Sequence, residues 1–288
     1  MDNIKIQLSK DGFVVIDLLD EREVNYLNDL SKKYLVSTTT DFISSSHFLS
    51  VEDSRYINQE LHKIITPRIQ NLFPELDLLG GTLATKVKGK AVLKTHNDWS
   101  IVDEEKYNSY NLWVALVDTD NRNGTLGLIP GSHLWKTDLR GLNIPGVYEK
   151  YTPEFLKIGW EPSLKAGQAI LYNHKLIHYS RPNLTDLPRN VAIVGMKDKE
   201  AGLRVSFTLD HQSINTYEAT EEDFYRFDAQ KILKNRLIHS IILTKSAIDW
   251  HVIAQQYDNY CPAEYKKKIP QPSIWSLCSS YFYNIMKK

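Results

Sequence analysis

The residues best suited to metal chemistry are His96 and Asp98, separated by Asn97, together with His178, which lies 80 residues beyond Asp98. In a β-strand, residues i and i+2 point to the same face, so His96 and Asp98 can present an imidazole and a carboxylate together. A distant strand would then supply His178. Two histidines and one carboxylate on one face of a metal leave three positions open, which is the arrangement of non-haem Fe(II) sites that bind a keto acid, O2 and substrate.

The His-x-Asp pattern is weak evidence by itself, because nine histidines make a chance occurrence common. The ordered sequence around it is more specific. It runs through Thr85–Gly89, Asn111–Asp118, Asn123–His133 with Pro-Gly-Ser-His at its end, Gly167–Tyr172, and His178–Asn183 with the pattern His-x-Ser-x-x-Asn, and then Arg189 opens another apolar run. From about Gly12 to about Leu209, this set resembles the phytanoyl-CoA dioxygenase family of Fe(II)- and 2-oxoglutarate-dependent oxygenases.

The resemblance implies Fe(II), 2-oxoglutarate and O2 as cofactors, with His96, Asp98 and His178 as the catalytic metal ligands. His174 competes for the third ligand position, but the pattern that starts at His178 matches the family and His174 does not. The alternative is that each histidine is a core or turn residue bonded to backbone. The ordered context favours the metal.

The resemblance also implies that Arg189 binds the distal carboxylate of 2-oxoglutarate. A dianion that enters a mostly apolar barrel needs a fixed cation, and a guanidinium group can donate two charge-assisted hydrogen bonds to one carboxylate. Arg181 is the alternative anchor. Its neighbour Pro182 indicates a turn, whereas Arg189 begins a strand that we expect beside the strand of His178.

Four further residues are predicted near the cosubstrate, each with an ordinary structural role as the alternative. By resemblance, Ser180 matches a hydroxyl that contacts the same carboxylate, and Trp113 matches an aromatic ring that lines the pocket. Asn97 replaces the Gln of the family's His-Gln-Asp motif and is predicted to hydrogen-bond near the cosubstrate, although it should project from the opposite strand face. Lys86 occupies a position where relatives often have a cavity lysine, and a solvated surface lysine is the alternative.

Hydrophobic periodicity predicts a β-rich core between helical flanks. Phe13–Asp17 is predicted as a strand, Asp20 as the start of a capping box and a helix to about Leu35, and Asn58–Leu72 as a second helix. Further strands are predicted at Lys90–Asp98, Asn111–Asp118, Thr125–Ile129, Gln168–Tyr172, Asn190–Met196 and Leu203–Leu209. Gly124, Pro130, Gly131 and Ser132 are predicted to form turns, and His133 to be structural.

These elements predict a mainly β fold with flanking helices, a double-stranded β-helix barrel of the jelly-roll, cupin-like type. We expect one domain over residues 1–288. Its helical N-terminal flank covers about 1–78, the barrel core about 79–210, and a helical C-terminal flank about 211–288, with about Glu218 to Tyr257 predicted as helix.

Composition excludes several classes of function. The 35 basic and 35 acidic residues cancel, so net charge suggests neither nucleic acid nor a membrane surface as the main partner. No apolar run is long enough to span a bilayer, and the N-terminus lacks a signal-peptide pattern, so we expect a soluble, cytoplasmic chain with Cys261 and Cys278 reduced. Phosphate-binding loops, a nucleophile elbow and Cys-x-x-Cys motifs are all absent from the sequence.

The functional hypothesis is therefore a dioxygenase that hydroxylates, desaturates or cyclises at an unactivated C–H bond of a small metabolite and releases succinate and CO2. The substrate is predicted to be a small polar molecule such as an amino acid derivative, and the oligomeric state is left open. Three alternatives remain. They are an acyl-CoA hydroxylase of the same family, a non-catalytic jelly-roll binding protein, and a hydrolase or isomerase that uses zinc or another divalent metal.

Overall fold

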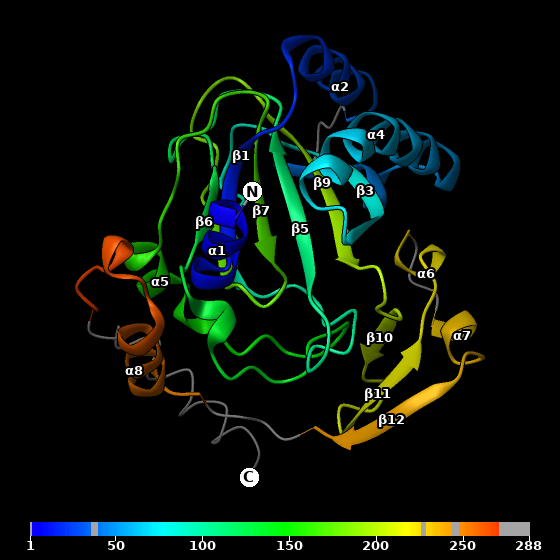
Figure 1. Cartoon of the computed structure of the whole chain (residues 1–288), viewed down its shortest axis with the longest axis vertical. Coiled ribbons are helices and arrows are strands. Elements are labelled where there is room, and N and C mark those ends of the chain that lie inside the picture. The colour runs from blue at the N-terminus through cyan, green and yellow to red at the C-terminus, as the bar shows by residue number, and fades with distance from the viewer. Residues whose placement is uncertain (1, 36–39, 226–228, 244–247, 271–288) are drawn as a thin grey trace.

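Two antiparallel sheets face each other at the centre of the molecule (Figure 1). The computed structural model describes residues 2–35, 40–225, 229–243 and 248–270. The larger sheet has six strands in the order β1 (Phe13–Asp17), β7 (Gln168–Asn173), β5 (Ser109–Ala115), β9 (Arg189–Asp198), β3 (Leu76–Lys86) and β2 (Phe42–Ser44). The smaller sheet has the order β4 (Leu93–His96), β8 (His178–Ser180) and β6 (Leu126–Leu128).

Side chains of the larger sheet alternate cleanly between two buried faces, as a period of two requires. The inner face carries Phe13, Trp113, Ile170, Tyr172 and Val191, and they pack with Leu126 and Leu128 of the smaller sheet. The outer face carries Leu112, Leu171 and Val194 and packs against helices. The predicted β core is confirmed, but strand pairings within the described residues do not close the two sheets into one barrel.

Helices of the N-terminal region cover the outer face of the larger sheet. They are α1 (Asp2–Asp11), α2 (Glu21–Tyr34), α3 (Ser45–Phe48) and α4 (Val51–Leu72). The predicted capping box of α2 is confirmed, because the Asp20 side chain accepts from the Glu23 backbone while Glu23 bonds back to the backbone of Asp20. Helix α4 begins seven residues earlier than predicted, since Ser50 caps it by accepting from the Asp53 N–H.

Strand β3 is longer than the sequence indicated. It begins at Leu76, where the N-terminal flank was expected to be helical, and contains Gly80 and Gly81, which interrupt the apolar pattern. A Cβ at Gly81 would lie 3.0 Å from the Leu61 side chain of α4, so the missing side chain lets helix and sheet approach closely. A local sequence pattern could not predict that β3 packs closely against a helix distant in the chain.

The predicted helical C-terminal flank is wrong in part. A third sheet forms there from β10 (Arg204–Phe207), β11 (Ser213–Glu218) and β12 (Leu237–Ile242). The strand predicted at 203–209 exists as β10, but it pairs with β11 and lies outside both core sheets. Short helices α6 (Glu222–Tyr225) and α7 (Ala229–Ile232) connect β11 to β12, and α8 (Trp250–Tyr260) follows. Strand β12 has three isoleucines among its six residues, and these suit a strand better than the helix we expected for this segment.

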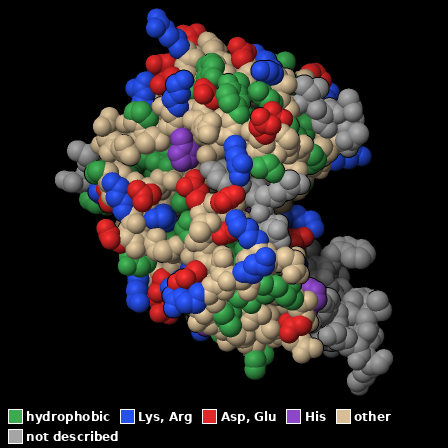
Figure 2. All heavy atoms as spheres, turned by 90° about the vertical axis from the view of Figure 1, so that its right-hand side faces the viewer, with side chains coloured by type: hydrophobic (Ala, Val, Ile, Leu, Met, Phe, Trp, Pro, Cys, Tyr) green, Lys and Arg blue, Asp and Glu red, His purple; other side chains and the backbone are tan. Residues whose placement is uncertain are grey.

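The remaining described elements lie between the core strands or near the C-terminus. They are α5 (Thr152–Ile158) and the 3-10 turns η1 (Ser132–Leu134), η2 (Glu149–Tyr151) and η3 (Ala263–Tyr265). Cys261 is a buried free thiol, and Cys278 lies outside the described residues. None of the helices in the described ranges has the length and apolar character needed to cross a membrane. Figure 2 shows basic and acidic side chains interspersed over one face, so that face presents no field of a single sign.

Candidate metal centre

The inner faces of the two core sheets carry the side chains of the candidate site. Strand alternation turns Lys86 of β3 and Arg189 of β9 inward, and these residues are direct partners in the strand register. On the smaller sheet, His96 of β4 is the register partner of His178 of β8. The fold thus joins residues that are about 80 to 100 positions apart in sequence.

Ligand atoms of His96, Asp98 and His178 all lie within 4.8 Å of one another. The His178 Nε2 atom is 3.7 Å from Asp98 Oδ1, and the two imidazole rings are 4.2 Å apart between centroids. Strand β4 ends at His96, so Asp98 lies two residues past the strand and its N–H donates to the His174 carbonyl oxygen at 3.0 Å. One Nε2 from each histidine and one carboxylate oxygen can therefore meet a single cation.

Backbone carbonyls fix which nitrogen of each ring faces the centre. The Nδ1 atom of His96 lies 2.7 Å from the Lys94 carbonyl oxygen, and the Nδ1 atom of His178 lies 3.0 Å from that of Leu176. Because a carbonyl oxygen only accepts, both Nδ1 atoms must carry the proton and both Nε2 lone pairs remain available. Such bonds orient metal-binding histidines and set their tautomer.

The ionisation of Asp98 and His178 also suits a divalent cation. Burial raises the pKa of Asp98, but His178, His174, His96 and the Asn111 amide outweigh it and hold the pKa at about 2. Burial, helped by the charge of His96, lowers the pKa of His178 to about 4, although Asp98 opposes this. A carboxylate and a neutral imidazole are the metal-binding forms of these groups, and both prevail at neutral pH.

Asn111 and Tyr172 contact the centre and were not singled out in the sequence. Asn111 Nδ2 donates to Asp98 Oδ2 at 2.8 Å, which turns the other oxygen toward His178. Burial and then the Asp98 charge raise the pKa of Tyr172, whose ring lies 4.9 Å from that of His178. The available signal was strand alternation, because Asn111 shares a strand face with Trp113.

His174, the rival third ligand, lies outside the ligand cluster but next to it. It is buried, and burial lowers its pKa, with the Asp98 charge opposing. Its backbone carbonyl is the acceptor for the Asp98 N–H. The fold thus gives His174 a place behind Asp98, whereas His178 faces it.

Lys86 and Arg189 form a pair of buried cations. The Lys86 ammonium donates to Ser180 Oγ and to the Arg181 carbonyl oxygen, both at 2.8 Å. Burial, helped by the charge of Arg189, lowers the pKa of Lys86 to about 7, and burial lowers the pKa of Arg189 to about 10. Within the described residues, Arg189 Nε has no hydrogen-bond partner and neither cation is paired with a carboxylate. Two buried, uncompensated positive charges are costly unless an anion joins them.

Ser180 and Trp113 lie beside this pair. The Ser180 hydroxyl accepts from Lys86 and donates to the Gly124 carbonyl oxygen at 2.8 Å. The guanidinium of Arg189 lies over the Trp113 ring, 5.5 Å from its centroid. Asn183, the last residue of the His-x-Ser-x-x-Asn pattern, donates to the Lys86 carbonyl oxygen at 2.9 Å and so ties the two strands together.

Arg181 and Asn97 are directed elsewhere. Arg181 Nε lies 2.7 Å from Glu161 Oε1, and its Nη2 donates to the Leu156 carbonyl oxygen. Asn97 Nδ2 donates to the Lys175 carbonyl oxygen at 2.5 Å, which fastens the turn between β7 and β8. Arg181 therefore already has a counter-ion, whereas Arg189 has none in the part of the chain that the structure describes.

The Pro-Gly-Ser-His turn supports the strand that carries His178. Gly131 has a φ of 80°, and the Ser132 hydroxyl accepts from the Ile177 N–H at 2.8 Å. His133 lies 3.0 Å from the Ser9 carbonyl oxygen through Nε2, which ties the turn to α1. These residues position β8 from outside the centre.

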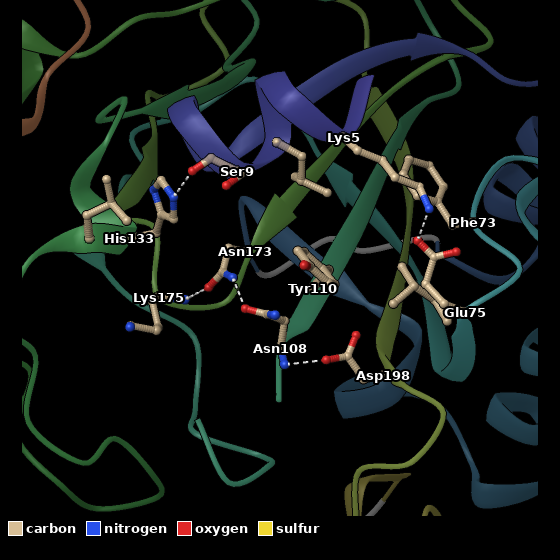
Figure 3. Close-up of a pocket in the computed structure, with 13 residues that line it drawn as sticks. Lys5, Ser9, Phe73, Glu75, Asn108, Tyr110, His133, Asn173, Lys175 and Asp198 are labelled. Carbon is tan, nitrogen blue, oxygen red and sulfur yellow. Dashed lines mark hydrogen bonds and ion pairs between the residues drawn. The ribbon is translucent and has the colours of Figure 1, made fainter. Parts of the chain in front are cut away.

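A cavity of about 320 Å³ lies on the outer face of the larger sheet, under α1 (Figure 3). Tyr110, Asn173 and Lys175 line it, and none of the ligand triad or the buried cations does. Tyr110 of β5 and Asn173 of β7 line the cavity, whereas their neighbours Asn111 and Tyr172 contact the metal centre on the opposite face of the sheet. The cavity is therefore a separate feature of the outer surface.

Facing antiparallel sheets with two histidines and one carboxylate on their inner faces define the class of jelly-roll, non-haem iron oxygenases. The model of the phytanoyl-CoA dioxygenase (PhyH) family matches residues 9–191, and the chain belongs to this family. It is a 2-oxoglutarate-dependent non-haem iron dioxygenase, an oxidoreductase with Fe(II), 2-oxoglutarate and O2 as cofactors.

Solved structures show the same fold at low sequence identity. The epimerase SnoN, in complex with Fe3+, alpha ketoglutarate and nogalamycin RO, is 20% identical with a TM-score of 0.53, covering 70% of this chain and 85% of that one. HygX from Streptomyces hygroscopicus, with nickel, 2-oxoglutarate and hygromycin B, is 16% identical with a TM-score of 0.52, covering 69% and 88%. EvdO2 from Micromonospora carbonacea var. aurantiaca, complexed with 2-oxoglutarate, is 16% identical with a TM-score of 0.53, covering 69% and 91%. A comparison with curated protein sequences gives no match.

Proposed function

We propose that this dioxygenase oxidises an unactivated C–H bond of a small polar metabolite, such as an amino acid derivative, by hydroxylation, desaturation or ring closure. His96, Asp98 and His178 hold Fe(II). The observation that carries this assignment is the convergence of two Nε2 atoms and one carboxylate oxygen within 4.8 Å. When bound, iron with 2-oxoglutarate and O2 supplies the oxidising power, and the chain supplies binding and orientation.

Arg189, Lys86 and Ser180 bind the distal carboxylate of 2-oxoglutarate in this proposal, and Trp113 forms the wall beside them. Support comes from two buried basic side chains that have no carboxylate partner among the described residues, of which Lys86 already donates to the Ser180 hydroxyl. A carboxylate there would compensate both charges at once. The predicted contact of Asn97 with the cosubstrate remains a proposal, and its bond to the β7–β8 turn supports a positioning contribution.

Two observations support a small polar substrate over an acyl-CoA. The tight basic cluster in the sequence, Lys266–Lys268, is partly engaged, because Lys266 Nζ lies 2.8 Å from the Asp258 carbonyl oxygen and Lys267 Nζ 2.7 Å from that of Gly159. A CoA thioester would need free basic side chains for its phosphates. SnoN and HygX, which share the fold, carry the small organic molecules nogalamycin RO and hygromycin B in their structures.

Single substitutions of the three ligands test the metal assignment. His96→Ala, Asp98→Ala and His178→Ala should each lower Fe(II) affinity and uncoupled succinate formation by at least about 10- to 100-fold, because each removes a direct ligand. His174→Ala is the matched control, a buried histidine beside Asp98 that lies outside the ligand cluster.

Iron stoichiometry, succinate release and circular dichroism should be measured for all four variants. A folded His178→Ala protein that keeps full iron content, with loss in His174→Ala, would transfer the third ligand to His174. Full iron binding in all three ligand variants would refute the proposed centre.

A further inference from the structure

The main chain of Asp98 is held from both sides. Its N–H donates to the His174 carbonyl oxygen at 3.0 Å, and its carbonyl oxygen accepts from Arg140 Nε at 2.7 Å. Its carboxylate also accepts from Asn111 at 2.8 Å. Since β4 ends at His96, these bonds replace the strand ladder in fixing the orientation of the residue.

Arg140 reaches Asp98 from the segment between η1 and η2, and both of its Nη groups donate to Glu104, with Nη1 also donating to Thr137 Oγ1 at 3.2 Å and to the Asp138 carbonyl oxygen. Nη1 and Nη2 bind the two carboxylate oxygens of Glu104, so the pair is bidentate. The side chains are only 12% and 20% exposed. A bidentate pair in this setting fixes the plane of the guanidinium group and hence the direction of Nε.

Backbone bonds complete the connection between the two segments. The Ser100 N–H donates to the Arg140 carbonyl oxygen at 3.1 Å, and the Ser100 hydroxyl donates to Glu104 Oε2 at 3.1 Å. Residues 98–104, which directly follow the His-x-Asp motif, are thus tied to residues 137–140 around a single guanidinium group.

We propose that Arg140 is a positioning residue for the metal ligand Asp98, and that Glu104 orients it. This inference rests on the proposed role of Asp98 in iron binding. By holding the carbonyl of Asp98, Arg140 limits rotation of this residue, which lies two positions past the end of β4. The carboxylate oxygen of Asp98 that is not bonded to Asn111 then faces His96 and His178. Removing groups that orient a ligand typically costs about 10- to 100-fold in metal affinity.

A second ion pair on the same segment provides a matched control. Arg204 Nη2 lies 3.1 Å from Asp103 Oδ2, with side chains 26% and 19% exposed. This pair ties residues 101–103 to β10 but makes no contact with Asp98. Arg204→Met therefore removes an ion pair of similar burial from the same segment and spares the metal ligand.

The test is the Co(II) dissociation constant and the Co(II) d–d absorption spectrum of the wild type, Arg140→Met, Arg140→Lys, Glu104→Gln and Arg204→Met, with the melting temperature of each metal-free protein. Arg140→Met should raise the dissociation constant about 10- to 100-fold and alter the spectrum. Arg140→Lys and Glu104→Gln should give intermediate values. Arg204→Met should keep both the constant and the spectrum, whatever its melting temperature.

Equal loss of Co(II) affinity in Arg140→Met and Arg204→Met would overturn the proposal, because a general loosening of the segment would then explain both. An unchanged spectrum and affinity in Arg140→Met would overturn it too. If Arg140→Met does not fold, the same criteria apply to Arg140→Lys.

The pathway through Asp98 is tested by combining Arg140→Met with Asp98→Ala. If Arg140 acts through Asp98, adding Arg140→Met to the Asp98→Ala variant should cause little further loss of Co(II) affinity. A full additional effect would overturn the proposal. Failure of the wild-type protein to bind Co(II) would instead refute the proposed function.

Discussion

At the scale of a single residue, the buried charge of Arg189 lowers the stability of the fold but suits the proposed binding of an anionic cosubstrate. Its guanidinium group is buried against Trp113, and its Nε lacks a partner within the described residues. Replacing a buried charge with an apolar side chain of similar volume is often neutral or stabilising, by about 1–4 kcal/mol. The charge is therefore explained by a ligand better than by the fold itself.

Arg189→Met should thus make the cofactor-free protein equally or more stable while it weakens 2-oxoglutarate binding about 150- to 5000-fold, since loss of one partner from a buried ion pair costs about 3–5 kcal/mol. Arg181→Met is the matched control. It removes the counter-ion of Glu161, which keeps a hydrogen bond from the Tyr179 hydroxyl, so it should lower stability and keep 2-oxoglutarate affinity. Urea unfolding and calorimetric titration measure both quantities. Loss of affinity in Arg181→Met with none in Arg189→Met would reverse the two roles.

In the proposed site, Lys86 should make the binding of 2-oxoglutarate dependent on pH. Burial and the neighbouring Arg189 lower the pKa of Lys86 from 10.5 to about 7. Between these values the unfolded chain binds more protons than the folded one, so the free energy of unfolding rises with pH across this window. An anion beside Lys86 raises the pKa again, so binding above pH 7 should take up a proton and weaken as pH rises.

Titration calorimetry at pH 8 in buffers of different ionisation enthalpy should reveal uptake of up to one proton per 2-oxoglutarate bound. Lys86→Met should abolish this uptake. Lys88→Met is the control, because Lys88 is exposed and paired with Asp186. Proton uptake that persists in Lys86→Met would assign the titrating group elsewhere.

At the scale of elements, a left-handed glycine shapes the turn that supports β8. Gly131 has a φ of 80°, and a Cβ there would lie 2.1 Å from the Tyr260 carbonyl oxygen at the end of α8. The neighbouring Ser132 holds the N–H of Ile177, one residue before His178. The turn thus links α8 to the strand of a proposed metal ligand.

Gly131→Ala should lower the free energy of unfolding by at least about 1–2 kcal/mol, the cost of a left-handed conformation for a residue with a Cβ, with the overlap adding to it. Gly146→Ala is the control, because a Cβ at Gly146 would meet nothing within 4 Å. Urea unfolding of the two variants decides the matter. Equal stability of both would show that the turn relaxes without cost.

At the scale of the whole molecule, the third sheet lies beyond the family match. The match ends at residue 191 and β10 begins at Arg204. This sheet nevertheless contacts the segments that border the metal centre, since the Leu142 N–H donates to the Ser206 carbonyl oxygen and Arg204 pairs with Asp103. Figure 2 shows hydrophobic side chains gathered on the lower part of the molecule. Strand β12 of the third sheet has the exposed side chains Leu237, Ile241 and Ile242.

The class of substrate depends on the side chains of the whole surface around the proposed metal centre. We expect succinate release to be stimulated by a member of a panel of amino acids and other small polar metabolites, at least about tenfold over the uncoupled rate, the effect of about 1.4 kcal/mol in barrier height. Fatty acyl-CoAs and peptides should give no stimulation, because the Lys266–Lys268 cluster is partly engaged in internal contacts. Stimulation by acyl-CoAs alone would favour the acyl-CoA hydroxylase alternative.

Local patterns in the sequence were sufficient for features that depend on neighbouring residues. The capping box at Asp20, the strand at Phe13–Asp17 and the existence of β5 and β7 could all be predicted, because the hydrogen bonds of a capping box and short apolar runs involve only a few neighbouring positions. The expected placement of His96 and Asp98 on one strand was wrong, because β4 ends at His96 and hydrogen bonds with His174, Arg140 and Asn111 orient Asp98 instead. The ordered motifs also predicted the family that the match confirms.

Only the tertiary structure decided which distant groups meet. It brought His178 next to His96 and Asp98 and left His174 outside that cluster. It gave Arg181 a counter-ion, left Arg189 without one among the described residues, and placed Arg140 on the carbonyl of Asp98. It also paired β10 with β11, although the alternation of β10 resembles that of a core strand. Strand partners and counter-ions depend on packing between segments that are far apart in the chain. A local sequence pattern does not contain that information.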